Sequence, residues 1–381
     1  MRFAIALLLV CPGFCQTANT YRFQLARPLE RLTSPEIYVD RQVTFRLRAP
    51  HASKVELLFS AWSRKPVPMS KDEDGVWQVT VGPLEPEIYT YAFQVDGIRM
   101  LDLNNPNLKT GGRALDASEL EIPAAAPRFD QLQQVPRGVL HVHSYVSSQL
   151  KINRSLYVYV PPQAIAQPDR RLPVLYLRHG NGDTESNWSD DGRAGIILDN
   201  LLARDRAVPM YIVMTNGYPG DAWANGSSPE AMNVLARELF DDVMPLMERT
   251  YKVLPGRENR AIAGLSMGGG QAFTIGLRNL DKFAWVAEFS SGLVSDAGFS
   301  LEKHVPGFLD NAAQSNGKLR LLYLGCGSED ERITGQQALV QKLKDHNIHH
   351  QFVTTPGAHE WKVWRHLLAD LLPRLFRSVS S

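Results

Sequence analysis

The sequence predicts a two-domain chain in which an all-β sandwich precedes an α/β domain with a mostly parallel, doubly wound sheet. Between about residues 35 and 122, short segments alternate apolar and polar side chains, which is the period of strands with one buried face. From about residue 137, nearly unbroken apolar runs alternate with helical patterns, as in parallel sheets that helices cover on both faces. The length of 381 residues suits two or three domains.

The composition excludes several classes of protein. Apolar residues make up 44% of the chain, which is too much for a disordered protein. The formal net charge of +1 lacks the basic excess typical of nucleic-acid binding. No apolar run reaches the roughly 18 residues that a membrane helix needs. We therefore expect no nucleic-acid partner and no membrane span, and the sequence leaves the oligomeric state open.

Residues 1–15 resemble a secretory signal peptide. A positive start precedes the apolar run Phe3–Val10, and the small residues Gly13 and Cys15 suit cleavage after Cys15. We expect a secreted or periplasmic protein, with a lipid anchor on Cys15 as the weaker alternative. Cleavage would leave Cys326 as the only thiol, and its apolar strand-like surroundings predict a buried side chain rather than a nucleophile.

The first domain is predicted to span residues 22–122. Asp-Gly pairs at 74–75 and 96–97 are turn signals between its strands. The expected strands include Val43–Leu47, Lys54–Phe59, Val76–Val81 and Tyr89–Val95. Trp77 lies within one of these alternating strands, so we expect it in the core of an antiparallel sandwich. Residues 123–136 are predicted to be a linker, which begins with a stretch rich in Pro and Ala.

The second domain is predicted to span residues 137–381. Apolar residues at helical spacing predict helices over Pro229–Tyr251 and Thr334–Asn347. The strand candidates are Leu172–Leu177, Met210–Met214, Arg260–Ala263, Trp285–Phe289, Leu319–Leu324 and Gln351–Thr355. Because the carboxyl ends of parallel strands meet at one edge of the sheet, we expect residues that follow these strands to lie close together.

A candidate nucleophile lies between one of these strands and a helical run. Residues 264–268 read Gly-Leu-Ser-Met-Gly, the G-x-S-x-G pattern, with the strand Arg260–Ala263 before it and a helical run after it. In such a strand–turn–helix the serine oxygen is exposed on a sharp turn. We therefore predict that Ser266 is a nucleophile, and that the backbone N–H of Met267 stabilises negative charge at the start of the helix.

A serine nucleophile needs a base that an acid orients, and here both can follow later strands. The strand Leu319–Leu324 ends in a loop with Glu329 and Asp330, and the strand Gln351–Thr355 ends in a loop with His359. We predict that Asp330 is the acid and His359 the general base, with Glu329 as the competing acid.

The second oxyanion donor is expected in the loop after the strand Leu172–Leu177. This loop reads His179-Gly180-Asn181-Gly182, and we predict that the backbone of Asn181, or else of Gly180, faces the oxyanion. His179 is expected to brace the loop. His141 and His143 lie on an expected strand without a third ligand nearby, so we predict a structural role and no metal.

Several stretches of the second domain together resemble carbohydrate esterase family 1, in the esterase D and enterochelin esterase-like branch of the α/β hydrolases. The stretches are residues 178–182, Trp188, 197–201, 257–269 and 359–364. The resemblance spans roughly residues 137–376. It implies Ser266, Asp330 and His359 as the catalytic triad, and it suggests Gly180, Trp188 and Trp364 as substrate-binding residues.

The first domain resembles the immunoglobulin-like modules of the family 48 carbohydrate-binding and isoamylase N-terminal type. Asp96-Gly97 and residues 102–106, Asp-Leu-Asn-Asn-Pro, carry this resemblance. Leu103 departs from the usual D-P-x-N-P pattern. The fold is expected, and the sequence leaves open whether the module binds glycan or, as we favour, only packs beside the active site and shapes its pocket. Trp62, near a turn, is a candidate for stacking on a sugar or for a lid.

The resemblance implies a secreted serine esterase that acts through an acyl-serine and needs no cofactor. The expected substrates are feruloyl or acetyl esters of plant polysaccharides. The alternatives are a hydrolase of enterobactin-type siderophore esters, an acyltransferase of the mycolyl-transferring type, and an inactive binding protein with the same fold.

Overall fold

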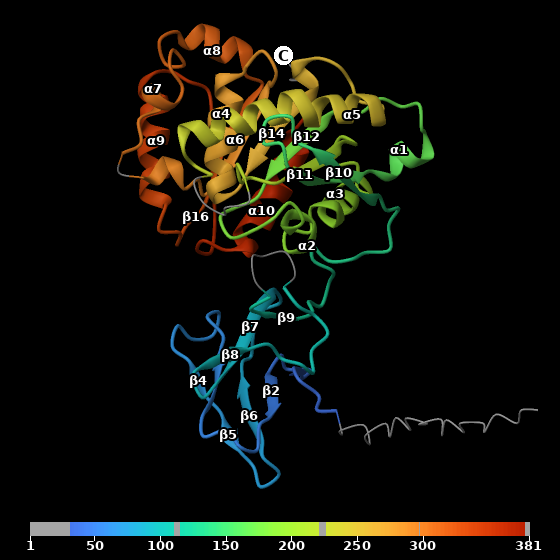
Figure 1. Cartoon of the computed structure of the whole chain (residues 1–381), viewed down its shortest axis with the longest axis vertical. Coiled ribbons are helices and arrows are strands. Elements are labelled where there is room, and N and C mark those ends of the chain that lie inside the picture. Colours follow the sequence, from blue (N-terminus) through green and yellow to red (C-terminus); the bar gives the residue numbers. More distant parts are fainter. Residues whose placement is uncertain (1–30, 110–114, 221–225, 297, 378–381) are drawn as a thin grey trace, which may run out of the picture.

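The computed structural model describes residues 31–109, 115–220, 226–296 and 298–377. Figure 1 shows two bodies, a strand-rich domain in blue and teal and a larger domain of strands and helices in green to red. The predicted signal peptide lies outside the described residues. Within the described ranges, no helix combines the length and apolar character that crossing a bilayer requires.

The smaller domain is a sandwich of two antiparallel sheets. One sheet has the strand order β1 (Glu36–Ile37), β2 (Val43–Arg48), β6 (Val76–Val81), β5 (Ser70–Lys71). The other has the order β4 (Val67–Pro68), β3 (Val55–Leu58), β7 (Ile88–Val95), β8 (Ile98–Met100), and β9 (Ser118–Glu121) also pairs with β7.

The alternating apolar residues of both sheets point inward and form the sandwich core, as the sequence predicts. Phe45 and Tyr91 meet edge to face with ring centroids 4.6 Å apart. Trp77 is 8% exposed and donates its indole N–H to the carbonyl of Ala49, so it belongs to the core. Trp62 is 47% exposed.

The motif that resembles family 48 modules forms a buried network of hydrogen bonds. Asp102 is fully buried and accepts hydrogen bonds from the hydroxyls of Ser34 and Tyr91. Asn105 donates to the Tyr91 hydroxyl and to the carbonyl of Glu119. Because these polar groups satisfy one another, the motif stabilises the sandwich from within.

The larger domain is built on an eight-stranded sheet with the order β10-β11-β13-β12-β14-β15-β16-β17. β10 and β11 pair antiparallel, and β11 also pairs antiparallel with β13, while the other neighbours are parallel. The strands are β10 (Val139–Val146), β11 (Asn153–Val160), β12 (Val174–Arg178), β13 (Tyr211–Thr215), β14 (Arg260–Gly264), β15 (Trp285–Phe289), β16 (Leu321–Gly327) and β17 (Gln351–Thr355).

Helices cover both faces of this sheet, which confirms the predicted α/β fold class. Side chains of α4, α5, α6 and α9 form one apolar core with the sheet, and those of α3 and α10 form a second core on the opposite face. The helices are α1 (Pro162–Ala166), α2 (Asn187–Asp190), α3 (Ala194–Leu202), α4 (Pro229–Glu238), α5 (Met244–Thr250), α6 (Ser266–Arg278), α7 (Leu301–His304), α8 (Ala312–Lys318), α9 (Ile333–Asp345) and α10 (Trp361–Leu371).

The single helix predicted over Pro229–Tyr251 is two helices joined by a π-helical turn, Leu239–Val243. Pro245 follows this turn and has no N–H to donate to the carbonyl of Asp241. The wider turn is a common response to such a break in an α-helical hydrogen-bond ladder.

Buried ion pairs join the two domains and the linker. Arg365 on α10 is 2% exposed, and it contacts Glu87 of the sandwich at 2.6 Å and Asp130 of the linker at 2.8 Å. Arg128 pairs with the same two carboxylates, at 3.2 Å and 2.9 Å. We call Glu87, Arg128, Asp130 and Arg365 the junction network. Charges buried this deeply require such partners, so the network holds the sandwich against α10.

Candidate active site

Ser266 lies on a sharp turn between β14 and α6. Its φ of +51° is in the left-handed region, which a serine adopts only when the surrounding structure imposes it. The chain packs tightly here, since a Cβ on Gly264 would lie 2.3 Å from the carbonyl oxygen of Gly268, and a Cβ on Gly268 would lie 2.3 Å from that of His179. The two glycines of the motif therefore allow the strand and the helix to meet.

The loops after β16 and β17 bring an acid and a base to this serine. His359 Nε2 lies 2.9 Å from Ser266 Oγ, and His359 Nδ1 lies 2.9 Å from Asp330 Oδ2. Because the carboxylate accepts from Nδ1–H, Nε2 is left free to accept the proton of the serine. The structure thus brings together the three residues that the sequence selected.

The environment of Asp330 keeps it ionised. The residue is 1% exposed, and burial by itself would raise the pKa of its carboxyl. Hydrogen bonds from His359 and from the backbone N–H of Arg332, at 3.0 Å, outweigh burial and hold this pKa below its ordinary value. Glu329 is exposed and makes no side-chain contact with the histidine among the described residues, so Asp330 rather than Glu329 occupies the position of the acid.

Cys326 lies behind the acid in β16 as a free, fully buried thiol. Burial, and secondarily the charge of Asp330, raises its pKa to about 12. The thiol therefore stays protonated and unreactive at neutral pH, as expected.

The predicted oxyanion loop lies directly against Ser266. A Cβ on Gly180 would lie 3.4 Å from Ser266 Cβ, so the loop passes within contact distance of the nucleophile. Gly180 and Asn181 line the same cavity as Ser266. Met267 is the second residue of α6, directly after the nucleophile, where backbone N–H groups have no partner within the helix. These are the positions that an oxyanion hole would use.

Side chains from neighbouring elements hold this loop in place. His179 Nε2 accepts from the N–H of Gly217 and its Nδ1 contacts the carbonyl of Gly180, each at 2.8 Å. Burial lowers the pKa of His179 to about 4, so the ring is neutral and braces the loop. The Tyr218 hydroxyl accepts from the N–H of Gly182 at 2.6 Å and donates to Asn181 Oδ1 at 3.0 Å.

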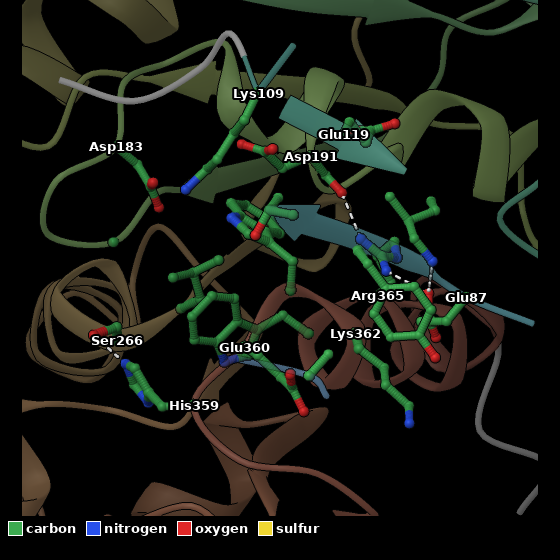
Figure 2. Close-up of a pocket in the computed structure, with 18 of the residues that line it drawn as sticks. Glu87, Lys109, Glu119, Asp183, Asp191, Ser266, His359, Glu360, Lys362 and Arg365 are labelled. Carbon is green, nitrogen blue, oxygen red and sulfur yellow. Dashed lines mark hydrogen bonds and ion pairs between the residues drawn. The ribbon is translucent and has the colours of Figure 1, made fainter. Parts of the chain in front are cut away.

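The triad opens into a cavity of about 340 Å³ between the two domains. Figure 2 shows Ser266 and His359 at one side and the ion pair of Glu87 and Arg365 at the other. The sandwich supplies part of the wall with Ser60, Ala61, Glu87, Ile88, Tyr89, Thr90, Lys109 and Glu119. The cavity is therefore built by both domains, with the sandwich packed beside the triad and shaping the pocket.

Carboxyl groups dominate the charge of this cavity. They come from Glu87, Glu119, Asp183, Asp191 and Glu360, and the cations are Lys109, Lys362 and Arg365. Burial raises the pKa of Asp183 to about 7, although the charge of Lys109 opposes the shift. Burial also raises the pKa values of Asp191 and Glu119.

Two of the three proposed substrate-binding residues line the cavity, and the third does not. Gly180 and Trp364 are part of its wall, and Trp364 meets His359 edge to face with ring centroids 4.9 Å apart. Trp188 is 1% exposed, donates its indole N–H to the carbonyl of Arg178, and packs against Phe289. The prediction for Trp188 is therefore wrong, because its ring fills the core beneath the loop.

The histidine pair on β10 has a protein partner. His141 Nδ1 and His143 Nε2 both contact the Tyr251 hydroxyl, at 2.9 Å and 2.5 Å. Among the described residues, no group of three or more His, Cys, Asp or Glu side chains is placed to hold a metal ion. Both rings stack or pack against Tyr251, which suits a structural role.

Comparisons with known protein families match both domains. The Esterase family model matches residues 147–375, and the model of carbohydrate-binding module 48 (isoamylase N-terminal domain) matches residues 33–107. The chain is 27% identical over 349 residues to an endo-1,4-beta-xylanase/feruloyl esterase of Xylanibacter ruminicola. The alignment covers 90% of this chain but 46% of that protein, so the chain spans about half the length of this relative.

Solved structures share the fold. A CE1 ferulic acid esterase from Anaeromyces mucronatus, in complex with ferulic acid, is 24% identical with a TM-score of 0.57, covering 68% of this chain and 98% of the other. The enterobactin esterase from Shigella flexneri is 17% identical with a TM-score of 0.64, covering 87% of this chain and 92% of the other. The second match is long enough to include parts of both domains.

Proposed function

Because the chain belongs to the Esterase family, we propose that it hydrolyses carboxylic esters through an acyl intermediate on Ser266. The observation that carries this proposal is the unbroken run of hydrogen bonds from Ser266 through His359 to Asp330. Hydrogen-bonded serine, imidazole and carboxylate groups are the arrangement that activates a hydroxyl for acyl transfer.

In this mechanism the Ser266 oxygen attacks the ester carbonyl while His359 Nε2 takes the hydroxyl proton. Negative charge on the carbonyl oxygen is met by the backbone N–H groups of Met267 and Asn181. Collapse of the tetrahedral species breaks the bond to the alcohol, and His359 gives that alcohol its proton. Water then attacks the acyl-serine by the same steps, and the acid is released with Ser266 restored. Asp330 holds the imidazole and stabilises its protonated form.

We propose that the acid is a hydroxycinnamoyl group such as ferulate, or acetate, and that the alcohol belongs to a plant polysaccharide. Aromatic side chains of Tyr89, Trp361 and Trp364 line the cavity, and Trp364 meets His359 edge to face. Such faces suit an aromatic acid, which gains from offset or edge-to-face contact. The similarity to the feruloyl esterase of Xylanibacter ruminicola supports this class of substrate.

The charge of the cavity separates this proposal from the siderophore alternative. An iron-bearing siderophore ester is anionic, and its binding would require an excess of cations. Five carboxyl groups and three cations line the cavity, and Glu87 is paired with Arg365 while Glu119 is paired with Arg193. The remaining charged groups are the carboxyls of Asp183, Asp191 and Glu360 against the ammonium groups of Lys109 and Lys362. A neutral carbohydrate ester avoids the repulsion that an anion would meet among these carboxylates.

We also place the activity outside the cytoplasm, because residues 1–15 have the pattern of a secretory signal. The substrate proposal is tested by measuring hydrolysis of methyl ferulate, acetylated xylan and ferric enterobactin with the purified full chain. We expect turnover of methyl ferulate or acetylated xylan that Ser266→Ala abolishes, and at least a hundredfold lower kcat/KM for ferric enterobactin. Preference for ferric enterobactin would reject the carbohydrate assignment, and full activity of Ser266→Ala would reject the mechanism.

A further inference from the structure

One wall of the cavity carries hydrogen-bonding groups that the triad does not use. Lys109 extends from the sandwich, and Asp183 and Asp191 come from the segment after β12 in the larger domain. Figure 2 shows the ammonium group of Lys109 directed toward the space between the two carboxyl groups. No ion pair within 4.0 Å connects Lys109 to a carboxylate among the described residues. All three side chains line the cavity, so their polar groups adjoin the space that a ligand would occupy.

The two carboxyl groups are buried and poorly satisfied. Asp183 is 8% exposed, and its carboxylate has a hydrogen bond with the backbone of Gly180 but receives no side-chain donor from the described residues. Asp191 is 5% exposed and receives one side-chain donor, the amide of Asn187. Neither group has an oxygen that is both fully buried and without a partner, so their spare acceptor positions are open to the cavity. The raised pKa values of both groups reflect their burial. Sites that bind ligand hydroxyls keep polar groups in this state.

This wall lies close to the nucleophile. A Cβ on Gly180 would be 3.3 Å from Asp183 Oδ2 and 3.4 Å from Ser266 Cβ, which places the carboxylate within about 7 Å of that Cβ. A group held by Asp183 is therefore directly next to the scissile ester. Glu119 of the sandwich lies farther from Ser266 in the same cavity (Figure 2), which Tyr89 also lines.

The donors and acceptors suit one class of ligand. Lys109 offers ammonium donors, while carboxylates accept hydrogen bonds. A sugar ring carries several neighbouring hydroxyls that each donate and accept, whereas a methyl or ethyl ester has none. We propose that Lys109, Asp183 and Asp191 bind hydroxyl groups of the esterified sugar, so that the sandwich takes part in selecting the alcohol. This inference rests on the proposed function and adds the residues that bind its alcohol.

The test compares one acyl group on two alcohols. Kinetics are measured for methyl ferulate and for a feruloylated arabinoxylan oligosaccharide, with wild type and Lys109→Met. We expect KM for the oligosaccharide to rise at least tenfold in Lys109→Met, while kcat/KM for methyl ferulate changes less than twofold. Lys65→Met is the matched control, because Lys65 is an exposed lysine of the same domain outside the cavity, and it should change neither value. Equal losses on both substrates, or no loss on either, would overturn the proposal.

A binding measurement separates this inference from the proposed function. Titration calorimetry with Ser266→Ala and an arabinoxylan oligosaccharide without ferulate needs no turnover and no acyl group. We expect measurable binding whose affinity falls at least tenfold when Lys109→Met or Asp183→Asn is added, with an unchanged thermal unfolding midpoint for Lys109→Met. Undiminished binding in both variants would contradict the sugar site, even if ester hydrolysis is established.

Discussion

Replacing Asp330 with asparagine changes one atom of the candidate triad and leaves its shape intact. Asp330 Oδ1 accepts from the backbone N–H of Arg332 at 3.0 Å, and Oδ2 accepts from His359 Nδ1 at 2.9 Å. The N–H of Arg332 needs an acceptor, so the amide oxygen of the introduced asparagine takes the place of Oδ1. The amide NH₂ then faces His359 Nδ1 as a donor. The neutral imidazole then adopts the other tautomer, in which Nδ1 accepts from the amide and Nε2 carries the proton. In this tautomer Nε2 can no longer accept the proton of Ser266.

The expected loss follows from this change of tautomer. A serine triad whose acid becomes an amide loses about 10⁴ in kcat, which corresponds to about 5 kcal/mol of transition-state stabilisation. We expect kcat for p-nitrophenyl acetate to fall by about 10³–10⁴ in Asp330→Asn, with KM changed much less. The assay is steady-state hydrolysis at pH 7.5, with circular dichroism to establish that the variant is folded.

Glu329→Gln is the matched control, because Glu329 is exposed and adjacent in sequence. It should keep kcat within about twofold of wild type. A large loss in Glu329→Gln together with an active Asp330→Asn would refute the assignment of the acid. A uniform small loss in both would show that no carboxylate orients His359.

Three further variants test the surroundings of the triad. Tyr218→Phe removes the hydroxyl that holds Asn181 and Gly182, so kcat for methyl ferulate should fall roughly tenfold at unchanged KM. An unchanged kcat would show that the oxyanion loop keeps its position without this hydroxyl. Arg365→Met removes one cation from Glu87 and Asp130 and should lower the free energy of unfolding, measured by thermal unfolding, by about 3–5 kcal/mol. The control Arg374→Met breaks an exposed pair and should lower it by about 1 kcal/mol or less. Burial raises the pKa of Glu288 from 4.5 to about 8, so the folded state holds this proton more tightly than the unfolded state and wild type loses stability as pH rises from about 4.5 to 8. Glu288→Gln should resemble wild type at pH 5 and unfold at a higher temperature at pH 8.5, and parallel pH profiles would contradict this.

The pattern of apolar residues predicted most of the larger domain, but not β11. This strand reads Asn-Arg-Ser-Leu-Tyr-Val-Tyr-Val, and its buried side chains begin with Arg154. A charged residue at a buried position interrupts the apolar pattern of the strand. Its partner Glu238 on α4, 3.0 Å away, is distant in sequence, so the sequence gives no sign that the arginine is paired and buried. The π-helical turn before Pro245 was not predicted for a different reason. The helical spacing of apolar residues continues through the turn.

The candidate triad could be predicted because each member directly follows a strand of one parallel sheet. The carboxyl ends of such strands meet at one edge of the sheet, so residues that follow them are expected to lie close together in space. The position of Lys109 could not be predicted, since it reaches the cavity only where the two domains pack together, and no local pattern encodes that contact. Trp188 was mistaken for a ligand contact because an aromatic residue in a loop looks the same in sequence whether its ring points outward or into the core. The fold class and the esterase resemblance, by contrast, are confirmed.

The central claim is that Ser266 is the nucleophile, and covalent trapping tests it most directly. The full chain is treated with a fluorophosphonate, which reacts with serines activated by an adjacent base, and the product is measured by intact mass and peptide mapping. We expect one adduct per chain, located on Ser266, no adduct in Ser266→Ala, and labelling at least a hundredfold slower in His359→Ala. An adduct that forms at the same rate in Ser266→Ala, or that maps to another residue, would contradict the account.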